Sequence, residues 1–279
     1  MHIAKLRSET SGDAQVVLAE VEWEDTDRPP DTVRISVTGL PCSLEPSPDS
    51  MLVACAVPAF AAGERRISID TPCSPLLLAS LPGMLALIGT WSPRFLGRRS
   101  PPRIEAQVEL SQAATVPRTA LFFSAGVDST HLLLQRGRPG GYGILINGFD
   151  VGGKRTQSND ALYDEIFKRS APLLAARGIL PLQVSTNIRH IDDRSEFWGD
   201  CFVGFALAAV AHALGGAASL FEIASNGEPL NHSVQSPDGI HPTLLYGLSS
   251  ERVSLLSPCL EISRMKRLRM IAQKREALA

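Results

Sequence analysis

The sequence predicts an α/β fold in which a Rossmann-like parallel sheet carries helices on both faces and follows a smaller, β-rich N-terminal domain. Three observations support this. Hydrophobic residues make up 44% of the 279 residues and charged residues 20%, which is enough for a large core and excludes a disordered chain. Short alternating runs fill the first part of the chain. From residue 118 onward, strand-like runs alternate with helical patterns, which is typical of a covered parallel sheet.

The N-terminal elements are mostly strands. In residues 31–40, Val33, Ile35 and Val37 alternate with polar side chains, and residues 14–23 show a similar pattern. Residues 51–57 and 66–69 are interpreted as strands for the same reason. The apolar run 75–91 is short for a membrane span and contains Pro82-Gly83, so it predicts a buried helix or helix pair and no membrane insertion.

A polar stretch rich in Pro, Gly and Arg follows at residues 92–103 and predicts a linker, after which 104–110 has the pattern of a strand. This change of character divides the chain into an N-terminal domain, 1–112, and a second domain, 113–279. The second domain has predicted strands at 120–123, 143–147, 180–184, 219–224 and 252–256. Helices are expected from 128 to 135 and over 159–177, 195–214 and 263–278, the last with Met265, Leu268 and Ile271 buried.

Charge and cysteine content narrow the class of protein. The formal net charge of −2 argues against a general nucleic-acid binder. Five scattered cysteines without a CxxC pair disfavour a disulfide scaffold or a thiolate zinc site and favour a reducing compartment. The first residues show no secretion signal, so we expect a cytoplasmic protein.

The segment 121–130, LFFSAGVDST, is the most informative part of the sequence. A buried strand runs into the small-residue turn Ser124–Gly126, and a helix begins near Asp128. Backbone amides at such a helix start bind phosphate, and serine and threonine hydroxyls add donors. Asp128 can cap the helix or hold a magnesium ion. The plain alternative is an ordinary strand–turn–helix with Asp or Ser as its N-cap.

The string SAGVDST resembles the SGGxDS loop of the N-type ATP pyrophosphatase (PP-loop) superfamily, which includes asparagine synthetase, GMP synthetase, 7-cyano-7-deazaguanine synthase and tRNA thiolation enzymes. The resemblance covers about residues 118–279. It implies the adenine nucleotide alpha hydrolase fold, ATP and Mg²⁺ as cofactors, and cleavage between the α- and β-phosphates. The implied pyrophosphate contacts are Ser124, Ala125, Gly126, Val127, Asp128, Ser129 and Thr130. Ala125 stands where the family has Gly, which matters if this position needs a positive φ.

The same resemblance implies further site residues. Leu145, Ile146 and Asn147 would receive the adenine, and Ser225, Gly227 and Glu228 would form a loop facing the nucleotide. The implied catalytic residues are Asp128, Lys154, Glu228, Arg264 and Lys266, with Asp128 and Glu228 as the magnesium ligands. Lys154 lies in a glycine-rich loop able to close over phosphates. Each of these positions also has a plain interpretation as a strand end, a turn or a solvated face.

Together these features favour an ATP-dependent, AMP-forming ligase. It would adenylate a small carboxylate or amide, release pyrophosphate and transfer a nitrogen nucleophile. No glutaminase segment is visible, since position 2 is His, so an ammonia- or amine-supplying partner fits this interpretation, as does a homodimer. Membrane and nucleic-acid partners are not expected. The alternatives are a tRNA-modifying sulfur transferase that uses the basic final helix, and a nucleotide-binding partner protein without turnover.

Overall fold

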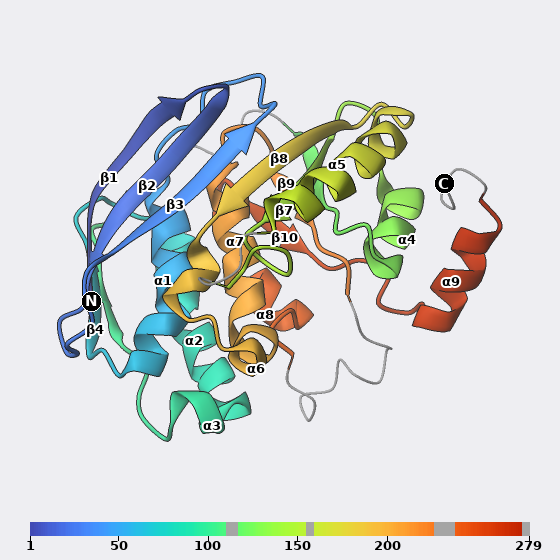
Figure 1. Ribbon diagram of the computed structural model, residues 1–279. Coiled ribbons are helices and arrows are strands. Elements are labelled where there is room, and N and C mark those ends of the chain that lie inside the picture. The colour runs from blue at the N-terminus through green and yellow to red at the C-terminus, as the bar shows by residue number, and fades with distance from the viewer. Residues whose placement is uncertain (110–116, 155–158, 226–237, 275–279) are drawn as a thin grey trace.

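Ten strands form one continuous sheet in the computed structural model, which describes residues 1–109, 117–154, 159–225 and 238–274 (Figure 1). Across the sheet the strands are β10 (Ser254–Leu256), β9 (Leu220–Glu222), β6 (Thr119–Phe122), β7 (Tyr142–Asn147), β8 (Leu180–Thr186), β3 (Asp31–Thr38), β2 (Ala14–Glu22), β1 (His2–Ser11), β4 (Arg66–Ile69) and β5 (Arg103–Glu105). The strands from β10 to β8 are parallel to one another, and the pairs β8–β3, β3–β2 and β2–β1 are antiparallel. At the other edge, β1, β4 and β5 are again parallel. The predicted α/β class is confirmed.

Helices cover both faces of the parallel strands. Successive residues of a strand point to opposite faces. Leu121 therefore packs with α4 (Val127–Arg136) and α5 (Asp160–Ala175), while Phe122 joins the core on the side of α7 (Val203–Ala213). At Gly143 of β7, an added Cβ would lie 2.7 Å from Leu174 of α5, so the absence of a side chain lets this helix approach closely.

The N-terminal half belongs to the same sheet and core. β3 pairs with β8 from Ile35↔Thr186 to Thr38↔Gln183, so β1–β3 lie beside β8 in Figure 1. Helix α1 (Pro48–Ala62) packs on α7, where the Ser50 hydroxyl donates to the carbonyl of Ala209 at 2.7 Å. The predicted boundary at 112/113 lies outside the described residues. The division into two domains therefore stays a prediction. In the structure, one sheet contains strands from both halves of the chain.

The predicted strand at 51–57 is wrong, because these residues lie inside α1. The Ser47 hydroxyl caps this helix by accepting from the Ser50 amide at 3.3 Å, and Pro48 occupies its first turn. Every residue from Ser50 to Phe60 is buried. The helix therefore has no polar face to reveal a 3.6-residue period, and its sequence looks like a buried strand.

Other elements differ in detail from expectation. Residues 75–91 form a single helix, α2 (Pro75–Trp91), and the linker contains α3 (Pro93–Leu96). The expected helix at 195–214 is divided into α6 (Ser195–Phe197), the π-helical turn η2 (Trp198–Phe202) and α7. Unpredicted elements are β1 (His2–Ser11), η1 (Ile188–Ile191) and α8 (Pro242–Gly247). The final described helix is α9 (Arg264–Ala272). None of the helices in the described ranges combines the length and apolar character that a membrane span requires.

Candidate functional site

A cavity of about 510 Å³ opens at the carboxyl ends of β6, β7 and β9. Ligands of parallel α/β sheets bind at this edge, because the strand-to-helix loops converge there. Eight of the predicted site residues line the cavity: Ser124, Gly126, Val127, Asp128, Ser129, Leu145, Ile146 and Arg264. Gly227 and Glu228 lie outside the described residues. Ala125, Thr130, Asn147, Ser225, Lys154 and Lys266 are not among the residues that line this cavity.

The loop between β6 and α4 is organised around the Ser129 hydroxyl. It accepts from the Ser124 amide at 3.2 Å and donates to the carbonyl of Gly126 at 3.1 Å. Gly126 is the N-cap residue of α4, and no side chain of the described residues caps this helix. The plain alternative, an Asp or Ser N-cap, is therefore not what holds the turn. The first-turn amides of α4 have no partner inside the helix and remain available to an anion.

Ala125 has φ = +58°, in the left-handed region. The position where the resemblance expects glycine thus has the backbone that favours glycine.

We expect Ala125→Gly to raise the free energy of unfolding by about 0.5–1 kcal/mol, since relief of left-handed strain exceeds the extra chain entropy of glycine. Urea denaturation measures the change. The control is Ala86→Gly at an exposed position inside α2, which should lose about 1 kcal/mol. Equal losses in both variants would contradict the assignment of strain.

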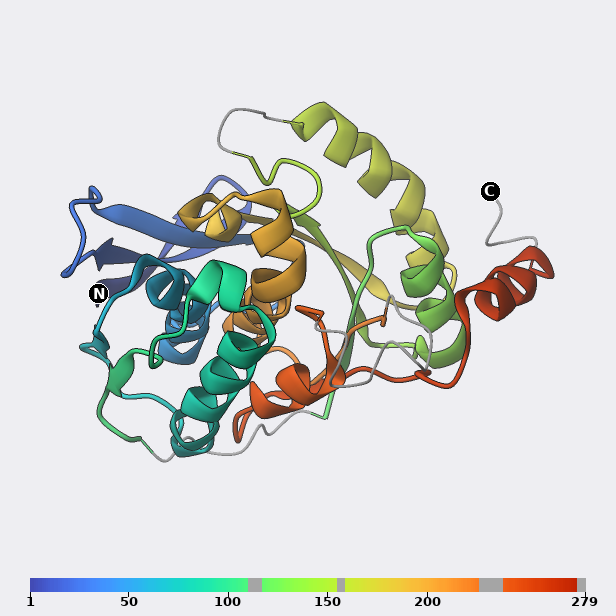
Figure 2. The ribbon, with the colours of Figure 1, turned by 90° about the horizontal axis from the view of Figure 1, so that it is seen from below.

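Asp128 is held by two arginines of α9, which lies beside α4 (Figure 2). Arg267 is 2% exposed, and its Nη1 lies 2.8 Å from Asp128 Oδ1. It also donates to the carbonyl of Ser225, and to that of Cys259 at 3.0 Å. Arg264 Nε is 4.0 Å from Asp128 Oδ2. Arg267 thus joins the start of α4, after the β6–α4 loop, to the chain after β9 and β10.

Sequence reasoning chose Arg264 and Lys266 on this helix and missed Arg267. The available signal was the spacing to Ile271, four residues later, which places both on the inner face. The expected burial of Met265 and Leu268 is wrong, since they are 58% and 42% exposed. Lys266 is exposed and does not line the cavity.

The opposite wall of the cavity is aromatic. Phe149 and Trp198 meet edge to face with ring centroids 4.9 Å apart. The Trp198 indole N–H donates to Asp150 Oδ1 at 3.2 Å, and the Arg189 guanidinium lies 4.7 Å from the Trp198 ring centroid. Arg189 Nη1 also donates to the carbonyl of Phe149 at 2.6 Å, and burial lowers the pKa of this guanidinium. Tyr163 of α5 also lines the cavity, packed in the separate core cluster of Leu121 and Leu174. Rings held in this way suit a flat heteroaromatic ligand.

Phe149, Tyr163 and Trp198 were not predicted as site residues. Residues 195–214 were interpreted as a core helix. In the structure, Trp198 is the first residue of the π-helical turn at 198–202 and lines the cavity. The Tyr163 hydroxyl donates to the Leu145 carbonyl at 3.0 Å, and burial raises the pKa of this phenol. The hydroxyl therefore remains a donor and holds α5 against the end of β7, where the base was expected.

Lys154 lies in a second cavity, of about 340 Å³, which is also lined by Arg34, Asn147, Gly148, Gly152, Asp160, Ser185, Thr186, Asn187 and His190. The segment 148–152 separates it from the first cavity: Gly148 and Gly152 line the second, whereas Phe149, Asp150 and Val151 line the first. The described structure therefore does not bring Lys154 to the cavity that the β6–α4 loop lines. Asn147 donates from Nδ2 to Asp160 Oδ1 at 2.7 Å and belongs to this second cavity.

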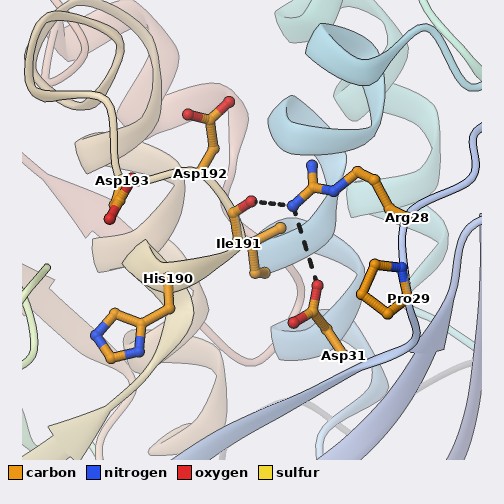
Figure 3. A pocket seen from close by; sticks show the side chains of 7 residues that line it. All are labelled: Arg28, Pro29, Asp31, His190, Ile191, Asp192 and Asp193. Atoms are coloured by element: carbon orange, nitrogen blue, oxygen red, sulfur yellow. Dashed lines mark hydrogen bonds and ion pairs between the residues drawn. The ribbon is translucent and has the colours of Figure 1, made fainter. Parts of the chain in front are cut away.

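A third cavity, of about 310 Å³, lies next to the second and shares His190 with it. Arg28 Nη2 donates to the carbonyl of Ile191 at 2.5 Å and lies 4.0 Å from Asp31 Oδ2, while the His190 ring points away from it (Figure 3). Asp192 is paired with Arg194. These contacts tie η1 to the start of β3. The described residues contain no cluster of three or more His, Cys, Asp or Glu side chains arranged for a metal ion.

Comparison of the chain with protein-family models, with curated proteins and with solved structures gives no match. What defines the class of this protein is therefore its architecture: an α/β fold with a mostly parallel ten-stranded sheet and a loop cavity at the carboxyl edge.

Proposed function

We propose that this protein is an ATP-dependent, AMP-forming ligase that binds its nucleotide in the cavity at the ends of β6, β7 and β9. The observation that carries the proposal is the uncapped N-terminus of α4, which opens into the same cavity as an aromatic wall. Free amides suit the two outer phosphoryl groups, and the rings of Phe149 and Trp198, with Tyr163 elsewhere on the cavity lining, suit the base. Arg264 at the same cavity adds positive charge for the phosphates.

In the proposed reaction, an oxygen of a carboxylate or amide acceptor attacks the α-phosphorus. The bond from that phosphorus to the oxygen bridging to the β-phosphorus breaks, and pyrophosphate leaves with the electron pair. An amine then displaces AMP from the adenylated acceptor and loses a proton. The chain's own contribution is electrostatic, because the amides at 125–128 and Arg264 neutralise charge that grows on the leaving group.

Magnesium would supply further neutralisation of the pyrophosphate. Asp128 and Asp238 line the cavity and would hold the ion together with phosphate oxygens, since carboxylate oxygens suit this cation. Asp128 Oδ1 is engaged by Arg267, so Oδ2 is the oxygen left for a metal. Glu228 stays a predicted ligand outside the described residues.

The ion pair between Asp128 and Arg267 favours a second candidate function, a nucleotide-binding protein without turnover. The carboxylate expected to hold the metal is already neutralised by a buried arginine. Such a protein would bind ATP in the same cavity and release no pyrophosphate.

The test of the proposal begins with binding. Trp198 on the cavity wall should change its fluorescence when the α,β-methylene analogue of ATP is added with Mg²⁺, and Trp198→Phe should lose that change. Gly126→Val, which places a side chain at the mouth of the loop, should weaken binding at least tenfold. The matched control is Gly216→Val, where an added Cβ meets nothing within 4 Å.

Turnover is then measured with α-labelled ATP, ammonia and a panel of carboxylates and amides. AMP with pyrophosphate is the expected product. Binding without any product would favour the non-catalytic candidate, and absence of nucleotide binding in the wild type would overturn both.

A further inference from the structure

We infer that the second cavity binds a carboxylate of the acceptor substrate through Arg34 and Lys154. This inference rests on the proposed function and names the class of its acceptor. The cavity occupies the carboxyl ends of β7 and β8, the edge that also carries the nucleotide cavity. The 148–152 segment contributes lining residues to both cavities.

The charges in this cavity point to an anion. Neither the Arg34 guanidinium nor the Lys154 ammonium has an ion pair or a side-chain hydrogen bond with any described residue. Other exposed arginines of the same sheet are paired, as Arg66 is with Glu24 and Glu105. One carboxylate, Asp160, also lines this cavity, and its Oδ1 accepts from Asn147 Nδ2 at 2.7 Å. The two unpaired cations leave the cavity with a net positive charge, which favours a bound carboxylate, since arginine offers it two parallel donors and lysine a point charge.

The backbone that carries Arg34 is held in place. The Arg34 amide donates to Asn187 Oδ1 at 2.8 Å, and Asn187 Nδ2 donates to the Thr32 carbonyl at 2.6 Å. The Thr186 hydroxyl donates to the Arg34 carbonyl at 2.7 Å. These hydrogen bonds fix β3 to the end of β8, so the backbone that carries Arg34 is held in one position. The N-terminal half of the chain thereby contributes to substrate recognition.

The separating segment adds a constraint on the acceptor. A carboxylate held by Arg34 and Lys154 lies on the far side of residues 148–152 from the phosphate loop. It is therefore the anchor and not the group that attacks phosphorus. The acceptor then carries two functional groups, an anchoring carboxylate and a second carboxylate or amide that reaches the nucleotide. Small dicarboxylates and their monoamides have this chemistry.

The experiment measures binding of malonate, succinate and glutarate to the full chain by calorimetry, with the corresponding diamides as neutral probes. At least one dicarboxylate should bind at least ten times more tightly than its diamide. Arg34→Ala and Lys154→Ala should each weaken that binding at least tenfold, as loss of one charge-assisted contact predicts. Arg252→Ala, an exposed arginine that lines none of the three cavities described above, should leave it unchanged.

Circular dichroism of each variant establishes that it is folded. No binding of any dicarboxylate at about 10 mM, a concentration that detects even weak complexes, would overturn the inference. So would equal binding by wild type and a folded Arg34→Ala. Nucleotide binding is followed separately through Trp198. Nucleotide binding without dicarboxylate binding would reject this inference and keep the proposed function. Dicarboxylate binding without nucleotide binding would reject the proposed function and, with it, the assignment of the dicarboxylate as an acceptor, although the carboxylate site itself would stand.

Discussion

Replacement of Arg267 by methionine is expected to lower the free energy of unfolding by about 3–5 kcal/mol, the usual cost of removing one partner of a buried ion pair. Methionine fills similar volume but leaves the half-buried carboxylate of Asp128 without its closest cation. The carbonyls of Ser225 and Cys259 lose their donor as well. Urea denaturation followed by circular dichroism measures the change.

Arg264→Met is the matched control, on the same helix and near the same carboxylate. Arg264 is 59% exposed and its Nε lies 4.0 Å from Asp128, so the loss should stay below about 1 kcal/mol. The double variant Asp128→Asn with Arg267→Met should cost less than the two single losses added, because it leaves no unpaired charge. A loss below 1 kcal/mol for Arg267→Met, or strict additivity, would show that this ion pair does not stabilise the packing of α4 against α9.

Substitution of Gly148 by alanine is expected to cost about 2–4 kcal/mol, which combines left-handed strain with overpacking. Gly148 has φ = +106°, and an added Cβ would lie 1.8 Å from the Thr186 carbonyl oxygen. The turn must therefore move away from β8. Because this turn separates the two cavities, the variant should also weaken binding of both nucleotide and dicarboxylate.

Gly140→Ala isolates the effect of the clash. Gly140 has φ = +80° but nothing within 4 Å of an added Cβ, so this variant should lose only the strain, about 1 kcal/mol. Thermal unfolding of both proteins gives the comparison. Equal losses of stability in the two variants would mean that the Thr186 carbonyl moves away from the new Cβ at no energetic cost. The turn at 148–152 would then not be a rigid separation between the two cavities.

The strand pattern of the chain predicts much of the sheet. Alternation at Val33, Ile35 and Val37 correctly indicates β3, and the apolar runs at 120–123 and 143–147 correspond to β6 and β7. Prediction from the hydrophobic pattern fails where an element is completely buried, as in α1. A helix without a solvent-exposed face does not show the 3.6-residue alternation of apolar and polar residues by which helices are recognised. The prediction also fails at 195–214, where a π-helical turn interrupts the helix.

For the candidate site, too, some features could be predicted from the sequence and others depend on the tertiary structure. The sequence alone places the loop Ser124–Gly126 at a strand end, because small residues, strand and helix are adjacent in the chain. The left-handed backbone of Ala125 is a finding of the structure. Only the tertiary structure selects Arg267 over Lys266, brings Trp198 to the cavity wall and places Arg34 and Lys154 on one cavity. The reason is physical: local sequence governs which backbone conformations are accessible. The partner of a charge or a ring depends on packing between segments that lie up to 139 residues apart, as Asp128 and Arg267 do.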